Sequence, residues 1–103
     1  MFANMDLKSV LMGELIGQKV AITKSTSRQL NGLTGKIVDE TMNTFVIETP
    51  AKEVTVQKKD CSFQFGSTVV DGKELQFRPE ERIRKYWRKF NARMQRHKLP
   101  RSR

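Results

Sequence analysis

The sequence predicts a mostly β protein: a small antiparallel barrel of five to six strands, with a short helix before it and a basic amphipathic helix after it. Three observations support this prediction. A length of 103 residues suits one domain with a modest core. Apolar and polar residues alternate in short runs between residues 17 and 77, as in half-buried strands. Apolar residues also recur with helical spacing on either side of that region. We therefore divide the chain into an N-terminal arm (1–16), a barrel (17–77) and a helical tail (78–103).

The N-terminal arm contains one short helical pattern. Leu7, Val10, Leu11 and Leu15 follow the spacing of a single helix face, and Asp6 is placed to cap the first turn. About two turns of helix are marginal in isolation and need a surface to pack on. Two alternatives follow: the arm packs against its own chain, or it becomes ordered on a partner protein.

The barrel region contains a series of strands separated by turn signals. A long polar stretch with two glycines, residues 25–35, separates the first two strands, and the turns that follow lie at residues 39–43 and at Pro50. Asp71-Gly72 predicts a tight hairpin turn. The predicted strands are 19–23, 36–40, 45–47, 53–57 and 61–65, and a final pair, 68–70 and 73–77. This strand count fits an Sm-like or SH3-like barrel, and an OB-fold is the nearest alternative.

The C-terminal segment predicts a helix that begins at Pro79. Proline suits the first helical position, and the acidic residues Glu80 and Glu81 suit the positive end of the helix dipole. The apolar residues fall on one face and the basic residues on the other, and Leu99-Pro100 ends the pattern. The apolar face comprises Ile83, Tyr86, Trp87, Phe90 and Met94, and the basic face Arg84, Lys85, Arg88, Lys89 and Arg96.

The charge of the protein is concentrated in this last segment. Residues 1–77 contain nine basic and nine acidic side chains, whereas residues 78–103 contain 11 basic and two acidic ones and so hold the entire net charge of +9. A neutral body with a basic helix indicates a polyanionic partner, most commonly a nucleic acid. No apolar run is long enough to predict a membrane span or a signal peptide, and a single cysteine fits a reducing compartment. We expect a cytoplasmic protein with no membrane partner.

Residues suited to catalysis or metal binding are few. Cys61 alternates with Phe63 and Phe65, which predicts a buried, inert thiol, and the only histidine, His97, lies near the end of the basic helix. One cysteine and one histidine are too few for a Cys/His metal site, and we interpret Asp39-Glu40 as turn carboxylates. We therefore expect no catalytic residue, no metal and no cofactor on this chain.

Several segments together resemble one known family. They are Glu14-Leu-Ile-Gly17, the block from Gly32 to Thr41, Asn43-Thr-Phe-Val-Ile47, Phe63-Gln-Phe65 and Arg78-Pro-Glu-Glu-Arg-Ile-Arg-Lys85. This combination is similar to ribonuclease P protein component 1, and the resemblance covers residues 14–89. The resemblance implies an Sm-like barrel in an archaeal ribonucleoprotein that removes the 5′ leader of precursor tRNA, with catalysis by an RNA that binds Mg²⁺. It also implies two partners, the ribonuclease P RNA and a zinc-ribbon protein subunit, with precursor tRNA contacted indirectly.

Charge and resemblance together assign candidate binding residues. We expect cationic side chains to contact RNA phosphates, because Lys and Arg release counterions there. We expect apolar residues of the two helices to contact the partner subunit. The RNA set is Lys24, Arg28, Arg78, Arg82, Arg84, Lys85, Arg88 and Lys89, and the partner set is Leu7, Val10, Leu11, Tyr86, Trp87 and Phe90.

Two other functions remain open at the level of the sequence. One is a small ribosome- or transcription-associated barrel that binds RNA by charge alone. The other is a protein-interaction module whose basic helix docks on an acidic partner. Cleavage of precursor tRNA that is indifferent to this chain would favour the first, and an absence of RNA affinity would favour the second.

Overall fold

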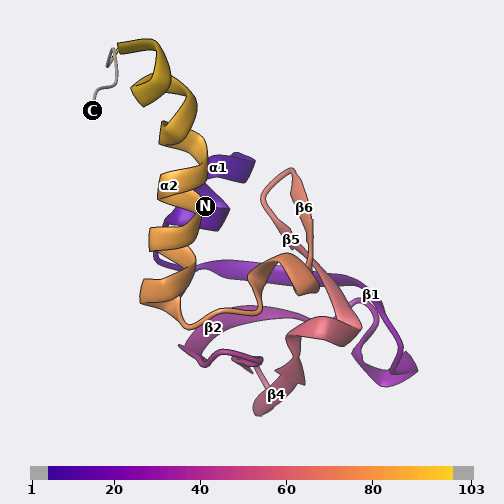
Figure 1. Ribbon diagram of the computed structural model, residues 1–103. Coiled ribbons are helices and arrows are strands. Elements are labelled where there is room, and N and C mark those ends of the chain that lie inside the picture. The colour runs from indigo at the N-terminus through magenta and orange to yellow at the C-terminus, as the bar shows by residue number, and fades with distance from the viewer. Residues whose placement is uncertain (1–4, 99–103) are drawn as a thin grey trace.

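The computed structural model describes residues 5–98, with side chains through Asn91. It contains two α-helices, six strands and three short 3₁₀ helices within that range (Figure 1). In chain order the elements are α1 (Leu7–Met12), β1 (Lys19–Ser25), η1 (Arg28–Leu30), β2 (Thr34–Glu40), β3 (Thr44–Glu48), β4 (Glu53–Gln57), η2 (Lys58–Asp60), β5 (Cys61–Phe65), β6 (Thr68–Asp71), η3 (Gly72–Leu75) and α2 (Pro79–Lys98). The predicted helix end at Leu99-Pro100 and residues 1–4 and 101–103 lie outside the described residues.

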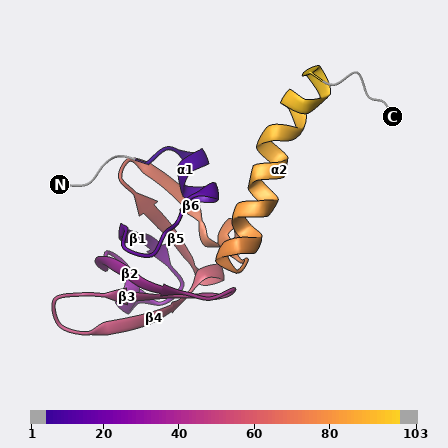
Figure 2. The ribbon, with the colours of Figure 1, turned by 90° about the vertical axis from the view of Figure 1, so that its left-hand side faces the viewer.

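All six strands belong to one antiparallel sheet with the order β4-β3-β2-β1-β5-β6. The central strand β1 pairs with β2 on one side and β5 on the other. Register shifts between Ile22 and Lys24 in β1, and between Ile37 and Asp39 in β2, allow the sheet to bend. Figure 2 shows the result: β2, β3 and β4 lie together at one end, and the β5–β6 hairpin rises from β1 toward α1. The prediction of a mostly β protein with two terminal helices is confirmed.

The core forms from the inward-facing residues of alternating strand positions. Ile22, Ile37 and Ile47 are fully buried, and the rings of Phe45 and Phe63 meet edge to face with centroids 5.1 Å apart. Cys61 is buried in this core, as predicted, and burial raises the pKa of its thiol. Strands β3, β4 and β5 lie where the alternation predicts them, whereas β2 begins earlier, at Thr34, and extends the sheet through Glu40.

The N-terminal arm packs on its own chain. Asp6 caps α1 by accepting a hydrogen bond from the Ser9 backbone N–H at 2.8 Å. Val10, Leu11 and Leu15 are buried in the main core, whereas Leu7 is 48% exposed. Intramolecular packing is therefore the alternative that this structure adopts. Val10 is fully buried and offers no surface to a partner, which corrects its assignment to the partner set, and Leu11 is only 5% exposed.

The segment before α2 differs from the prediction. The hairpin turn lies at Gly66-Ser67, where Gly66 has φ 63°, and not at Asp71-Gly72. Asp71 instead caps η3 by accepting from the Lys73 N–H at 3.0 Å, and the predicted strand 73–77 is absent from the described fold. Gly72 is needed for close packing, since a Cβ there would lie 1.7 Å from the Lys58 carbonyl oxygen. The predicted strand is wrong because this glycine serves a tertiary contact and not a turn.

Candidate nucleic-acid interface

The inward face of α2 carries an arginine that sequence patterning placed on the surface. Arg82 is fully buried, with 0% of its side chain exposed. Its Nη1 donates to the carbonyl oxygens of Val10 (3.0 Å), Leu11 (2.9 Å) and Gly13 (3.0 Å), at the end of α1. Its Nε and Nη2 donate to the Glu40 carboxylate at 3.2 and 3.1 Å. The Arg82 guanidinium therefore has its hydrogen bonds within the protein and is not exposed, and we remove Arg82 from the RNA set.

Glu40 also binds a second buried cation. Lys58 Nζ lies 2.9 Å from Glu40 Oε2 and donates to the carbonyl oxygens of Thr41 (2.7 Å), Leu75 (2.8 Å) and Phe77 (3.2 Å). Burial is the main cause that lowers the pKa of Lys58, and the hydrogen bond that Lys58 donates to the Glu40 carboxylate opposes it. We call Glu40, Lys58 and Arg82 the buried ion cluster. Its hydrogen bonds connect the barrel with η3 and with both helices. Glu40 is thus buried and paired, which corrects its interpretation as a turn carboxylate.

Tyr86 completes the inward face of α2. Its side chain is 3% exposed, and its hydroxyl donates toward the Glu74 carbonyl oxygen (2.8 Å) and Glu74 Oε1 (3.1 Å). Burial and the contact with Glu74 raise the pKa of Tyr86 to about 12. Its ring meets that of Phe77 edge to face. Tyr86 therefore serves packing within the chain and has little surface left for a partner.

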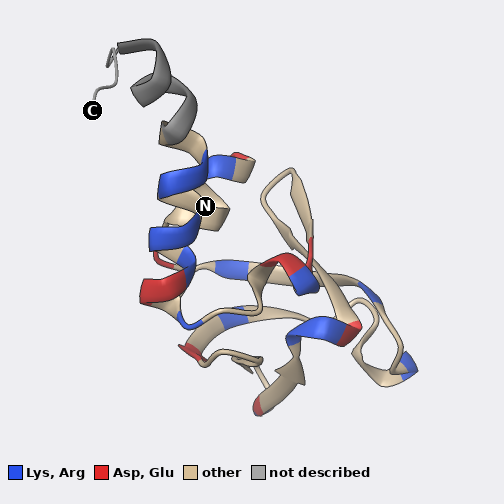
Figure 3. Ribbon diagram, viewed as in Figure 1, with Lys and Arg blue, Asp and Glu red and all other residues tan. Residues whose placement is uncertain are grey.

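Apart from Arg82, the basic residues between Arg78 and Lys89 are exposed, whichever way they lie around α2. Lys85 Nζ lies 4.7 Å from the centroid of the Phe77 ring, and Lys89 Nζ lies 5.9 Å from that of Tyr86. Figure 3 shows Lys and Arg as successive blue bands along the described part of α2. No ion pair engages them within the described part of the chain. The exposed basic residues of this segment are Arg78, Arg84, Lys85, Arg88 and Lys89, which we call the α2 basic face.

The two remaining residues of the RNA set lie elsewhere. Lys24 and Arg28 are exposed at the end of β1 and in η1, and Figure 1 shows the end of β1 far from α2. Lys24 lines a polar hollow of about 300 Å³, where Lys59 and Lys73 add positive charge. Asp60 and Asp71 line the same hollow and offset part of that charge. The fold thus does not join Lys24 and Arg28 to the α2 basic face.

An apolar groove of about 400 Å³ lies between α1, β6 and α2. Its exposed apolar residues are Leu7 (48%) and Val69 (56%), and Phe90 lies half-buried in its wall. Four residues of the partner set line this groove, namely Leu7, Leu11, Tyr86 and Phe90, whereas Val10 and Trp87 do not. Sequence analysis missed Val69, because Val69 and Val70 are both apolar and alternation does not show which of the two faces outward.

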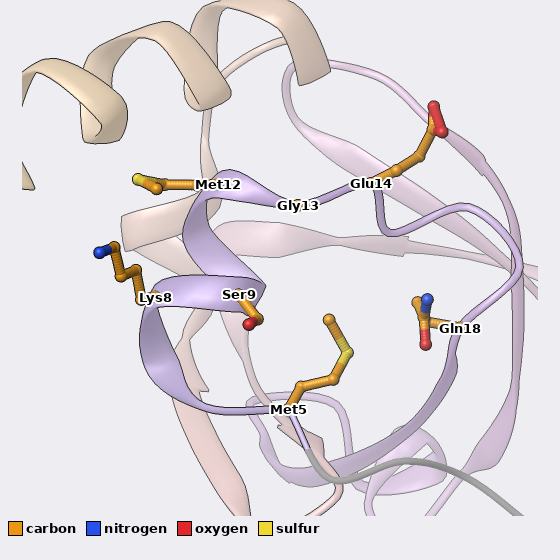
Figure 4. A pocket seen from close by; sticks show the side chains of 7 residues that line it. All are labelled: Met5, Lys8, Ser9, Met12, Gly13, Glu14 and Gln18. Carbon is orange, nitrogen blue, oxygen red and sulfur yellow. The ribbon is translucent and has the colours of Figure 1, made fainter.

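A second hollow, of about 540 Å³, lies beside the N-terminal arm. Figure 4 shows Met5 extending between Ser9 and Gln18, whereas the ionisable residues Lys8 and Glu14 point away from it. This lining directs no acid or base into the space. Among the described side chains, no group of three or more His, Cys, Asp or Glu residues could hold a metal ion. Within residues 5–98, no helix is both long and apolar enough to span a membrane.

Comparison with known proteins identifies the family. The model of ribonuclease P/MRP subunit p29 matches residues 8–85, which is most of the chain. The chain belongs to this p29 family. The match includes most of α1, all six strands and the first part of α2, so the buried ion cluster and three of the five residues of the α2 basic face lie within the p29 region.

Curated relatives of this p29 family member carry the name ribonuclease P protein component 1. The relative from Methanothermobacter thermautotrophicus is 43% identical over 88 residues, which cover 80% of this chain and 95% of the relative. The one from Methanocaldococcus jannaschii is 45% identical over 82 residues, covering 75% and 86%. A solved structure titled "Structure of Mth11: A homologue of human RNase P protein Rpp29" shares 45% identity with a TM-score of 0.49, covering 68% of this chain and 97% of that one.

Proposed function

We propose that this p29 family member is a non-catalytic RNA-binding subunit of ribonuclease P, which assists the RNA-catalysed removal of the 5′ leader from precursor tRNA. The observation that carries the proposal is the α2 basic face: a row of exposed cations on a chain of this family. Lys and Arg side chains arranged in this way neutralise phosphates and displace condensed counterions. Arginine adds a planar fork that fits two phosphate oxygens at once. Mg²⁺ for the reaction would be bound by the RNA.

The α2 basic face can be tested through the salt dependence of RNA binding. We replace Arg84, Lys85, Arg88 and Lys89 together with glutamine and measure binding to ribonuclease P RNA from low to high salt. If each cation meets one phosphate, the slope of log K against log salt falls by about 3 to 4 units. An unchanged slope would remove α2 from the RNA interface.

Charge-matched variants control for the loss of net charge. Lys85→Gln with Lys89→Gln changes the α2 basic face, and Lys36→Gln with Lys52→Gln makes the same change on exposed positions of the sheet region. The helix pair should weaken RNA binding more than the sheet pair. Equal losses would mean that only the overall charge of the protein matters. Reconstituted cleavage of precursor tRNA then tests whether the subunit is needed for processing.

We further propose that the apolar groove binds the zinc-ribbon protein subunit. Its exposed apolar residues Leu7 and Val69 and the half-buried Phe90 line it from three different elements, α1, β6 and α2. Val69→Lys should abolish co-purification with that subunit and leave the salt slope for RNA unchanged. Undiminished co-purification would exclude the groove as the subunit contact. A cytoplasmic location remains a prediction from the sequence.

A further inference from the structure

Among the α2 side chains described through Asn91, Trp87 is the large apolar residue that is most exposed. Each helical residue advances about 100° around the axis, so Trp87 lies about 140° from the buried Arg82. It is 50% exposed, whereas its neighbour Tyr86 is buried. The apolar groove does not include it either, since α2 contributes Tyr86, Lys89 and Phe90 to that groove. Neither core packing nor the groove therefore accounts for a tryptophan at this position.

The surroundings of Trp87 are cationic. Arg84 lies one turn before it, about 60° around the helix, and Arg88 follows it directly. Both arginines are exposed, and neither forms an ion pair within the described residues. The acidic residues Glu80 and Glu81 are confined to the first turn of α2, roughly 10 Å away along the axis at a rise of 1.5 Å per residue. An exposed indole beside a pair of exposed arginines is thus the local arrangement, since Arg84 and Arg88 are four residues apart and lie on the same side of Trp87.

We propose that Trp87 stacks on an unpaired base of the bound RNA while Arg84 and Arg88 hold the phosphates on either side of it. This inference rests on the proposed function, because it requires that α2 bind RNA. An indole offers the flat apolar surface that a base needs, and such stacking tolerates any of the four bases. Unpaired bases in loops and bulges are the parts of a structured RNA that can turn outward onto an aromatic side chain. Charge complementarity favours RNA over a protein at this position, since a polyanion matches both arginines.

The protein contains one tryptophan, so its intrinsic fluorescence reports on Trp87 alone. We titrate the full-length protein with ribonuclease P RNA and, separately, with a perfectly paired RNA duplex. Stacking predicts strong quenching by ribonuclease P RNA and much weaker quenching by the duplex, which offers no unpaired base. Equal quenching by both RNAs, or none by either under conditions where the protein binds, would overturn the inference.

Matched variants separate stacking from charge. Trp87→Phe retains an aromatic ring and should bind ribonuclease P RNA almost as well as the original chain. Trp87→Leu retains an apolar, helix-forming residue and should lose about 5- to 100-fold in affinity with no change in the salt slope. Arg84→Gln with Arg88→Gln should instead reduce the slope by nearly 2 units. Circular dichroism verifies that each variant keeps its helix.

The outcomes distinguish this inference from the proposed function. If the original protein binds ribonuclease P RNA and Trp87→Leu binds it equally well, the inference is wrong and the proposed function stands. If the original protein does not bind that RNA at physiological salt, the proposed function fails first. If Trp87 fluorescence responds to the zinc-ribbon subunit alone and not to RNA, Trp87 is a protein contact and the inference is overturned.

Discussion

The two faces of α2 contain the same kind of residue and use it in opposite ways. On the inward face, Arg82 is fully buried and makes five hydrogen bonds to protein acceptors. On the outward face, Arg84 and Arg88 are exposed and form no ion pair within the described part of the chain. The first arginine fixes the shape of the molecule, and the other two remain available to a ligand. Residue type alone therefore does not tell which arginines of this helix are exposed; the position around the helix relative to Tyr86 does.

The largest effect is expected from removing Glu40, the carboxylate that pairs with Arg82 on the inward face of α2. Glu40→Ala leaves two buried cations without their shared carboxylate, and a buried charge without a partner is costly. We expect a loss of about 3 to 5 kcal/mol in the free energy of unfolding. Urea denaturation measures it. Glu53→Ala, at an exposed end of β4, is the control and should change stability by no more than about 0.5 kcal/mol.

Replacing one arginine on each face of α2, in two separate variants, tests the comparison directly. Arg82→Gln should cost about 2 to 3 kcal/mol, less than Glu40→Ala because Lys58 still pairs with the carboxylate. It should also speed hydrogen exchange at the Val10 N–H, which bonds to the Asp6 carbonyl oxygen within α1. Arg88→Gln should leave stability and exchange unchanged and weaken RNA binding. A loss of stability in Arg88→Gln with none in Arg82→Gln would refute the assignment of a structural inward face and an available outward face to α2.

The sequence predicts those parts of the fold that depend on residues close together in the chain, and it fails where residues far apart in the chain meet. Val54 and Val56 alternate with polar residues, and so do Phe63 and Phe65. This alternation locates strands β4 and β5 correctly, because a side-chain period of two is a local property. Asp71-Gly72 misleads because the glycine there makes room for the Lys58 carbonyl oxygen. No local pattern records that a distant carbonyl oxygen will pack against this residue.

The buried ion cluster is the part of the site that the sequence least reveals. Charged residues are ordinarily exposed, and Lys58 and Arg82 lie 18 and 42 residues from Glu40. The register shift in β2 between Ile37 and Asp39 also changes the alternation, so that Glu40 faces inward where strict alternation would direct Asp39. By contrast, the exposed cations of α2 could be predicted, because composition and helical period alone place them.

Tyr86 offers a smaller test of the inward face through pH. Its pKa is raised from 10 to about 12 by burial and by Glu74, so the folded protein binds this proton more tightly than the unfolded chain does. The corresponding stabilisation is complete below pH 10 and is lost as the pH rises toward 12. Since Tyr86 is the only tyrosine, the ultraviolet absorbance of tyrosinate follows it alone. A midpoint near 10 in the folded protein would contradict the buried contact with Glu74.

The smallest effect is expected away from α2. Lys24→Gln with Arg28→Gln removes two exposed cations away from α2, and Asp60 and Asp71 already offset positive charge in the hollow that Lys24 lines. We expect the salt slope for ribonuclease P RNA to fall by less than with Arg84→Gln and Arg88→Gln, which remove the same charge. A larger fall would show that the RNA is centred on the β1 end of the sheet and not on the helix.

The hydrogen bonds from Arg82 to the arm also limit how the protein can be shortened. Its Nη1 reaches the carbonyl oxygens of Val10, Leu11 and Gly13, which precede it by 72, 71 and 69 residues. A truncated chain that begins at Glu14 would keep every strand and the whole of α2, yet it would lose those acceptors and leave part of a buried guanidinium without partners. The choice of first residue in an expression fragment would therefore decide whether the distant C-terminal helix is held in place, so RNA binding by such a fragment would understate that of the full chain.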